Sequence, residues 1–335
     1  MTHHAPVAYG PAIRDGFAHL LARHPETFAI GQGLWSPWYV GNSMTNLDAD
    51  FGKERVIDTP VSEAACTSAA LGAALSGRRP IVIHPRVDFF ILAMDAVVNQ
   101  AAKWNHMFGG GIPVPVVFRA IINRGGEQGA QHSQSLASWF AHVPGLRVVM
   151  PSTPRDAREL LVAAALGDDP VVYVDDRWCY ERTEPLGPVE EWDIATQGPA
   201  VRRRGDDVTI VSYSFCAWQC EQAAESLAAL GVSAEVIDLR VINPLDLRIV
   251  FESVARTGRL LCVDGDWAAC GVAGEVISQC AEAGLLRSSA PRRLALPPAP
   301  APTSGRLERD YYLRVEDIVD AAMSMVAGAP REARC

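Results

Sequence analysis

The sequence predicts an α/β protein of two domains, each built on a parallel sheet flanked by helices. Three observations support this prediction. Short runs rich in β-branched residues alternate with longer runs of helical period, which is the order that a parallel sheet requires. A stretch rich in Glu, Pro, Gly and Arg at 181–207 interrupts the alternation once. The length of 335 residues also corresponds to about two domains of ordinary size.

The first domain is predicted to span residues 1–180. Its strands are expected in five apolar runs, at 27–30, 80–83, 115–121, 146–150 and 171–174. Its helices are expected in the segments of 3.6-residue period, at 13–23, 62–75, 90–108, 133–141 and 155–166. The last helix has the clearest start, because Thr153 can cap it and Pro154 stands where a missing N–H costs nothing. Asp156 completes the spacing of a capping box.

The second domain is predicted to span residues 208–335, with 181–207 as the linker before it. Its strands are expected at 208–212, 234–239 and 260–263. Its helices are expected at 217–229, 247–255, 272–283 and 315–325. The proline-rich stretch 296–305 cannot hold a helix or a central strand, so we expect it to be extended.

Composition and charge exclude several classes of protein. The net charge is −9, and the basic residues form only short runs, such as Arg202–Arg204 and Arg292–Arg293, so no nucleic-acid-binding function is expected. The apolar windows are shorter than the roughly 20 residues of a membrane-spanning helix, so no membrane partner is expected either. The N-terminal residues do not resemble a secretory leader, which predicts a cytoplasmic location. The eight cysteines form no C-x2-C pair, so they predict neither a zinc nor a redox motif.

Polar residues gather where the strand expected at 115–121 ends. Gly125–Gly126 and the polar run 127–134 follow it, and open α/β sheets bind ligands at the carboxyl ends of their strands. His132 lies in this run beside Gln131. It is interpreted either as a general acid or base, or as a hydrogen-bonded structural residue, and the residues alone favour the latter.

Two further places carry reactive side chains. Glu63 directly precedes an apolar helix, where the simplest interpretation is that Ser62 caps the helix and Glu63 is a first-turn acid favoured by its dipole. His84 and Arg86 end a predicted strand and together suit a carboxylate or a phosphate. No G-x-S-x-G, H-E-x-x-H or glycine-rich phosphate loop occurs after a strand, so the sequence does not predict a serine hydrolase, a zinc protease or a nucleotide-binding protein.

Six segments in a fixed order carry a family resemblance. They lie at 51–63, 72–81, 95–103, 129–134, 144–152 and 240–246. Together they resemble the β subunit of the thiamine-diphosphate-dependent E1 component of 2-oxo-acid dehydrogenases, of the pyruvate and branched-chain type. The similarity runs from about residue 8 to about residue 325. It implies a transketolase pyrimidine-binding-like first domain and a transketolase C-terminal-like second domain.

The resemblance also implies roles for individual residues. Glu63 would hydrogen-bond N1′ of the aminopyrimidine of thiamine diphosphate and so promote loss of the proton from thiazolium C2, which prepares the cofactor to attack a substrate carbonyl. His132 would lie in the active-site channel and assist substrate binding and acyl transfer. Phe89 would pack near the aminopyrimidine, with Phe90 as the alternative in register. Gln32 stands near the cofactor, at a place where the family usually has a carboxylate.

The other half of the expected site is not found in the sequence. In this family a Gly-Asp-Gly…Asn motif on the α subunit holds Mg²⁺ and the diphosphate, and the nearest match, Gly265-Asp266-Trp267, lacks the second glycine and the asparagines. The chain is therefore expected to provide no metal ligand for the cofactor. The resemblance implies an obligatory α subunit in an α2β2 heterotetramer, and a lipoyl acyltransferase as a possible further partner.

Several departures from the family leave the substrate open. Gln32, the segment His84-Pro85-Arg86 and the pair Ala120–Ile121 all replace usual family residues near the expected mouth of the site. The main hypothesis is decarboxylation of a 2-oxo acid and transfer of the fragment to an acceptor. The alternative is a split transketolase-like carboligase in which His84 and Arg86, with Gln131 nearby, bind a sugar phosphate or a second carboxylate. A scaffold without catalytic activity is disfavoured by Glu63 and His132.

Overall fold

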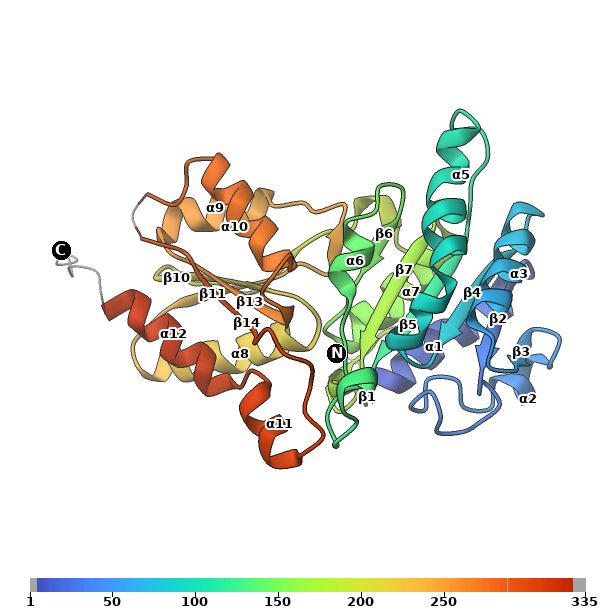
Figure 1. Cartoon of the computed structure of the whole chain (residues 1–335), viewed down its shortest axis with the longest axis horizontal. Helices are drawn as coiled ribbons and strands as arrows, with labels where there is room; N and C mark the ends of the chain where they lie inside the picture. Colours follow the sequence, from blue (N-terminus) through green and yellow to red (C-terminus); the bar gives the residue numbers. More distant parts are fainter. Residues whose placement is uncertain (1–4, 288, 328–335) are drawn as a thin grey trace. The chain divides into compact units, whose positions relative to one another are not determined.

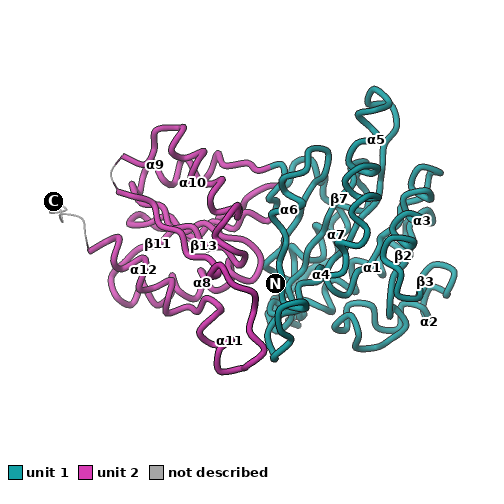
Figure 2. The backbone as a smooth tube through the Cα atoms, in the orientation of Figure 1, with its two compact units in different colours: residues 1–197, 241–244 teal, residues 198–240, 245–335 magenta. Residues whose placement is uncertain are grey.

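The computed structural model describes residues 5–287 and 289–327, and it separates into two compact units (Figure 2). The first unit extends to Gln197 and also contains Val241–Pro244. The second unit contains Gly198–Arg240 and the chain from Leu245 onward. Residues 328–335, which the sequence analysis assigned to the second domain, lie outside the described residues. Among the described helices, none is long and apolar enough to cross a membrane.

A seven-stranded sheet forms the centre of the first unit (Figure 1). In spatial order its strands are β12 (Val241–Asn243), β6 (Arg147–Val149), β7 (Val171–Asp176), β5 (Val117–Ile122), β4 (Arg79–His84), β2 (Thr27–Gln32) and β3 (Val56–Thr59). All neighbours are parallel except β12, which runs antiparallel to β6. Every residue of β5 and β7 is buried, as is typical of parallel strands covered on both faces.

Apart from α2, which was not predicted, the helices of the first unit follow the predicted order. They are α1 (Tyr9–Arg23), α2 (Leu47–Phe51), α3 (Glu63–Leu75), α4 (Val87–Phe90), α5 (Ala102–Met107), α6 (Ala137–Ala141) and α7 (Pro154–Leu166). Helix α1 packs against α7, and α3 packs against β4. The predicted cap of α7 is confirmed, because the Asp156 amide donates to Thr153 Oγ1 at 3.0 Å.

The prediction of one continuous helix at 90–108 is wrong. The segment consists of α4, a 3₁₀ turn (Ile91–Ala93), a π-helix (Asp95–Ala101) and α5. The prediction at 133–141 was also too long, since α6 begins only at Ala137 and a separate one-turn helix covers Ala130–His132. Both π-helical and 3₁₀ turns share the approximate apolar spacing of an α-helix, so the sequence pattern did not separate them.

The second unit is built on a five-stranded sheet. In spatial order the strands are β14 (Arg292–Leu296), β13 (Leu260–Trp267), β10 (Val208–Ser212), β11 (Ala234–Asp238) and β9 (Ala200–Arg203). Its helices are α8 (Ser214–Ala229), α9 (Arg248–Thr257), α10 (Val272–Glu282), α11 (Gly305–Tyr311) and α12 (Val315–Ala327). Helices α8 and α12 share an apolar core with the sheet. The proline-rich stretch between β14 and α11 contains neither helix nor strand, as predicted, but it bends rather than running fully extended.

Two short strands close the first unit near its N-terminal end. Strand β1 (Pro6–Ala8) pairs antiparallel with β8 (Thr183–Pro185). Neither was predicted, because each is only three residues long and mostly not buried. The pairing fixes the start of α1 beside the segment that follows β7.

A buried ion pair crosslinks the two central strands of the first unit. Arg119 in β5 donates from Nε and Nη2 to the two carboxylate oxygens of Asp175 in β7, both at 2.9 Å. Both side chains are fully buried. The Tyr180 hydroxyl also donates to Asp175, at 2.5 Å. Such a bidentate pair satisfies the Asp175 carboxylate and most of the Arg119 donors inside an apolar sheet.

Candidate active site

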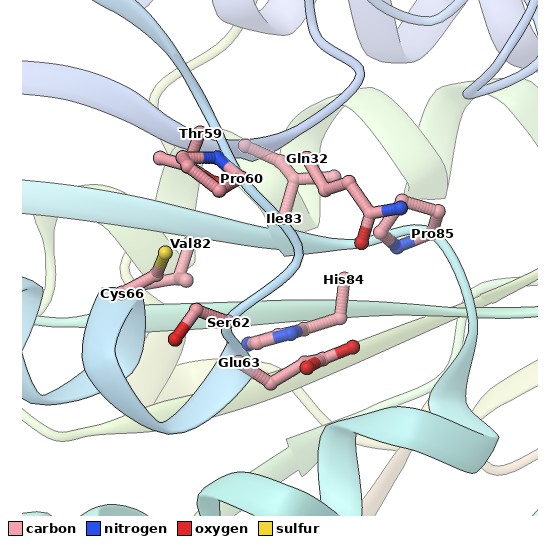
Figure 3. Close-up of a pocket in the computed structure, with 11 residues that line it drawn as sticks. Gln32, Thr59, Pro60, Ser62, Glu63, Cys66, Val82, Ile83, His84 and Pro85 are labelled. Atoms are coloured by element: carbon pink, nitrogen blue, oxygen red, sulfur yellow. The ribbon is translucent and has the colours of Figure 1, made fainter.

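A pocket opens at the carboxyl ends of β2, β3 and β4, beside the first turn of α3 (Figure 3). The space within it, including the part that opens to solvent, is about 220 Å³. The lining residues are Gly31, Gln32, Thr59, Pro60, Ser62, Glu63, Cys66, Val82, Ile83, His84 and Pro85. The pocket arises from the topology: β2 pairs in parallel with both β3 and β4, so the residues that follow all three strands meet at one edge of the sheet.

Glu63 lines this pocket as the first residue of α3 and is partly exposed. Ser62 makes no side-chain capping hydrogen bond, so the predicted capping role of Ser62 is wrong. Figure 3 shows the Glu63 side chain beside His84, with Gln32 on the other side of the pocket. Glu63 therefore places a carboxylate at the edge of a space that also has apolar walls, formed among others by Val82 and Ile83.

His84 forms the inner wall of the pocket at the end of β4 and is only 3% exposed. Its Nε2 lies 3.2 Å from the Thr67 hydroxyl on α3, and its ring packs on Phe90 with centroids 4.5 Å apart. Burial lowers the pKa of His84 to about 3. The imidazole is therefore neutral at physiological pH, and it shapes the pocket rather than supplying a positive charge.

The buried state of His84 predicts a pH dependence of stability. The unfolded imidazole takes up a proton near pH 6.5, and the folded one only near pH 3, so between these values the unfolded chain binds more protons. The free energy of unfolding should therefore fall as the pH falls, by about 2 kcal/mol between pH 7 and pH 5 from this group. Urea unfolding at both pH values should show this loss in the wild type and not in His84→Asn. An equal loss in both proteins would contradict the prediction. The control is His106→Asn, which changes an exposed histidine and should show the same loss as the wild type.

Gln32 and the turn after β2 form the opposite wall. Gln32 Nε2 donates to the Tyr39 hydroxyl at 2.7 Å. The turn is held by Asp58 on β3, whose Oδ1 accepts from the amides of Gly33 at 2.6 Å and Leu34 at 3.2 Å. No motif in the sequence singles out Asp58 as a residue that positions the site, although Asp58 lies in one of the six family-like segments.

Arg86 holds the loop that carries His132. Its Nη1 donates to the carbonyl oxygens of Asn123 and His132, both at 3.1 Å, and its Nη2 donates to Gln128 Oε1 at 2.8 Å. Gln131, next to His132, is exposed. The Arg86 guanidinium therefore positions the loop after β5.

Phe89 and His132 contact each other beside this loop. Their rings meet edge to face, with centroids 5.1 Å apart and planes at 79°. Phe89 is partly exposed, whereas Phe90 is fully buried and stacks on Phe140. Of the two phenylalanines, Phe89 is thus the one that a ligand can reach.

Asp88 is a site-region residue that the sequence did not indicate. Its side chain is 2% exposed, and its Oδ1 accepts from both the amide and Nε2 of Gln134, at 3.0 and 3.1 Å. Burial raises the pKa of the Asp88 carboxyl. Asp88 thus fastens the end of the His132 loop to α4, and no motif in the sequence distinguishes it from an ordinary helical acid.

Comparison with known proteins finds a family match for most of each unit. Residues 5–180 match the family "Transketolase, pyrimidine binding domain", and residues 198–318 match "Transketolase, C-terminal domain". The chain is 34% identical to the 2-oxoisovalerate dehydrogenase subunit beta of Bacillus subtilis, over 96% of this chain and 98% of that protein. It is 37% identical to the pyruvate dehydrogenase E1 component subunit beta-2, mitochondrial, of Oryza sativa subsp. japonica, over 93% and 84%.

The chain belongs to the family of E1 β subunits of thiamine-diphosphate-dependent 2-oxo-acid dehydrogenases. The predicted family resemblance and fold class are thereby confirmed. This E1 β chain is also 40% identical to the acetoin:2,6-dichlorophenolindophenol oxidoreductase subunit beta of Cupriavidus necator, over 95% and 96% of the two chains. A solved structure described as "Split gene transketolase, inactive beta4 tetramer" has the same fold, with a TM-score of 0.76 and 20% identity over 96% and 98% of the two chains.

The residues that line the pocket of this E1 β chain have the chemistry that one part of thiamine diphosphate requires. A flat heteroaromatic ring with polar edges needs apolar walls and a few polar groups at its rim. Val82, Ile83 and Pro85 provide apolar walls, and Glu63 provides a carboxylate. The buried Thr59 hydroxyl has no hydrogen-bond partner within the described chain, so it is also free to contact a ligand.

Proposed function

We propose that this E1 β chain activates thiamine diphosphate through Glu63, within an enzyme that decarboxylates a 2-oxo acid and transfers the acyl or aldehyde fragment to an acceptor. The observation that carries the proposal is the position of the Glu63 carboxylate at the edge of a partly apolar pocket, at the carboxyl end of the sheet. This is where ligands bind in open α/β folds.

Glu63 can act on the cofactor by holding a proton. When bound, thiamine diphosphate supplies an acidic thiazolium carbon and an electron sink for decarboxylation. The Glu63 carboxylate would share a proton with N1′ of the aminopyrimidine and stabilise the tautomer that accepts the C2 proton. The apolar side chains of Val82 and Ile83 would exclude water from this part of the pocket, which would strengthen such a hydrogen bond.

His132 is proposed as the group that acts on the substrate. Arg86 donates to its backbone carbonyl and Phe89 contacts its ring, and Arg86 directly follows Pro85, which lines the pocket; His132 itself does not line it. From there it would donate a hydrogen bond to the substrate carboxylate or move a proton during fragment transfer. Gln131 is exposed on the same turn and is kept as a proposed substrate contact.

The geometry favours this proposal over the split carboligase. That alternative uses His84 and Arg86 as an anion-binding pair. His84 is buried and its pKa is lowered to about 3, so it carries no positive charge near neutral pH. The Arg86 guanidinium donates to Asn123, His132 and Gln128 of its own chain. A sugar phosphate would therefore have to displace existing hydrogen bonds at one member of the pair and would find no charge at the other.

An α subunit is the expected partner, because the related chains carry β-subunit names. We propose that this partner holds Mg²⁺ and the diphosphate, that the assembly is α2β2, and that a lipoyl acyltransferase accepts the fragment. The cytoplasmic location stays a prediction. Co-expression with the α subunit, followed by assays of 2-oxo acids and of acetoin with lipoyl and dye acceptors, tests this function directly.

The split site predicts that the isolated chain binds its cofactor poorly. Without the partner, the aminopyrimidine contacts alone have to overcome the cost of immobilising the cofactor, so affinity should be at least 100-fold weaker than in the assembly. Calorimetry with thiamine diphosphate and Mg²⁺ on the chain alone, and then on the assembly, measures the difference. Micromolar binding by the chain alone would show that the diphosphate anchor lies within it.

A further inference from the structure

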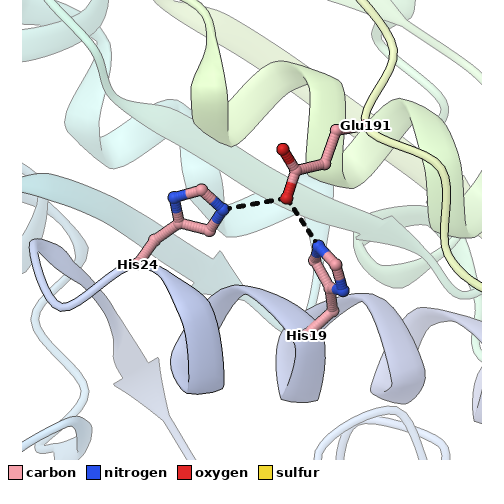
Figure 4. Close-up of side chains that lie close together, drawn as sticks. All are labelled: His19, His24 and Glu191. Atoms are coloured by element: carbon pink, nitrogen blue, oxygen red, sulfur yellow. Dashed lines mark hydrogen bonds and ion pairs between the residues drawn. The ribbon is translucent and has the colours of Figure 1, made fainter.

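A cluster of two histidines and a glutamate lies on the first unit, outside the pocket described above. Glu191 Oε1 lies 2.8 Å from His19 Nε2 and 3.1 Å from His24 Nε2 (Figure 4). The potential ligand atoms of the three residues all lie within 4.8 Å of one another. His19 and His24 belong to α1 and its C-terminal cap, whereas Glu191 comes from the segment after β8. The three side chains therefore converge from segments far apart in the sequence.

The backbone on both sides of the cluster is held in place. The His24 carbonyl accepts a hydrogen bond from Arg55 Nη2 at 3.1 Å, which fixes the end of α1. On the other side, the Glu190 amide donates to Glu159 Oε2 on α7 at 3.1 Å, which fixes the residue next to Glu191. The site is thus preorganised by contacts that do not involve the clustered side chains.

The donor atoms and their spacing suit a zinc-like ion. Two imidazole nitrogens and one carboxylate oxygen are preferred ligands of Zn²⁺ and its neighbours, whereas Mg²⁺ and Ca²⁺ prefer oxygen atoms. Tetrahedral bonds of about 2.0 Å place neighbouring ligand atoms about 3.3 Å apart. The Glu191–His19 and Glu191–His24 separations of 2.8 and 3.1 Å need only a small opening to reach this spacing.

A carboxylate lies behind one of the histidines. Glu26 Oε1 is 3.7 Å from Nδ1 of His24, on the ring nitrogen that does not face Glu191. Metal-binding histidines commonly direct their second nitrogen toward a carboxylate, which favours the proton on that nitrogen. In the metal-free protein His24 Nε2 donates to the Glu191 carboxylate, so a metal ion has to displace this proton. The tautomer with its proton on Nδ1 then offers the Nε2 lone pair to the metal.

We propose that His19, His24 and Glu191 bind a divalent transition-metal ion of the zinc class, with water completing its coordination. The metal would tie the C-terminal end of α1 to the segment that contains Glu191. The cluster does not belong to the reaction centre: His24 precedes the first residue of β2, Thr27, whereas Gln32 at the other end of this strand lines the pocket. Six strand residues extend over about 17 to 20 Å, so the ion would act on stability and not on catalysis.

Zinc titration of the full-length chain tests the site. The titration is done by calorimetry in excess Mg²⁺, and Co²⁺ is used as a spectroscopic probe, because its visible absorption reports nitrogen ligands in a tetrahedral site. We expect one Zn²⁺ per chain at this site and a higher melting temperature on binding. His19→Asn, His24→Asn and Glu191→Gln should each lower its affinity at least about tenfold, because each removes a direct ligand. His106→Asn, which changes an exposed histidine on α5, should leave this affinity unchanged.

The same titration distinguishes a metal site from a cluster that is only a hydrogen-bonded His–Glu–His arrangement. Absence of zinc binding, or equal binding by the wild type and by His19→Asn/His24→Asn, would overturn the proposal. Melting curves recorded without metal identify any variant that does not fold. In that case Glu191→Gln, which keeps a hydrogen-bond acceptor at the same place, provides the decisive comparison.

Discussion

Replacement of Glu63 by glutamine should reduce turnover of the α-containing enzyme by about 100- to 10,000-fold. Glutamine has the same shape as glutamate but cannot share a proton with the aminopyrimidine, so the C2 proton of the cofactor should exchange slowly. The change lies in the first turn of α3, where the side chain is only partly buried, and no large loss of stability is expected. Proton exchange at C2, followed by NMR in the reconstituted assembly, measures this step apart from substrate binding.

The matched control is Glu225→Gln, an identical chemical change at an exposed position of α8 in the second unit. This variant should retain wild-type turnover and exchange. Near-normal C2 exchange in Glu63→Gln would refute the proposed role of Glu63, and would leave the family membership intact because that rests on the whole chain.

Replacement of Arg119 by methionine should destabilise the protein by about 3 to 5 kcal/mol. The change leaves the Asp175 carboxylate fully buried without its bidentate partner, with only the Tyr180 hydroxyl still donating to it. A buried unpaired charge is costly because little solvent or counter-charge can reach it. Urea unfolding at pH 7, followed by circular dichroism, measures the loss.

The double variant Arg119→Met/Asp175→Asn separates the lost ion pair from lost packing. Asparagine removes the unpaired charge and still accepts from Tyr180, so most of the stability should return. If the double variant is as unstable as Arg119→Met, the loss comes from packing in β5 and not from the isolated charge.

Local chemistry made many elements predictable from the sequence. Thr153 and Pro154 marked the start of α7 because capping depends on neighbouring residues only. Strands β5 and β7 were found because strands buried on both faces are continuous apolar runs. The strands β3 and β9 were missed, since each is short, only partly buried and lies at an edge of its sheet, so its pairing depends on a neighbour that is distant in sequence.

The residues of the site also divide into those that the sequence indicated and those that only the structure revealed. Motif resemblance singled out Glu63, Phe89 and His132, because a family pattern is a linear property of the chain. It did not reveal that Asp58 holds the turn after β2, or that Asp88 holds the His132 loop. Those roles exist only once strands and loops have been brought together.

The sequence by itself therefore determined the α/β class, the order of the main elements and the family, and it predicted an α-subunit partner, since all of these follow from local propensity and motif order. The tertiary structure decided the charge state and the contacts of each side chain. His84 is neutral because it is buried against Thr67 and Phe90. Arg86 holds the loop after β5 because its guanidinium donates to the carbonyls of Asn123 and His132. His24 and Glu191, 167 residues apart, met because α1 and the segment after β8 pack together. Burial and long-range contacts set these charge states and side-chain contacts, and neither can be predicted from a local stretch of sequence.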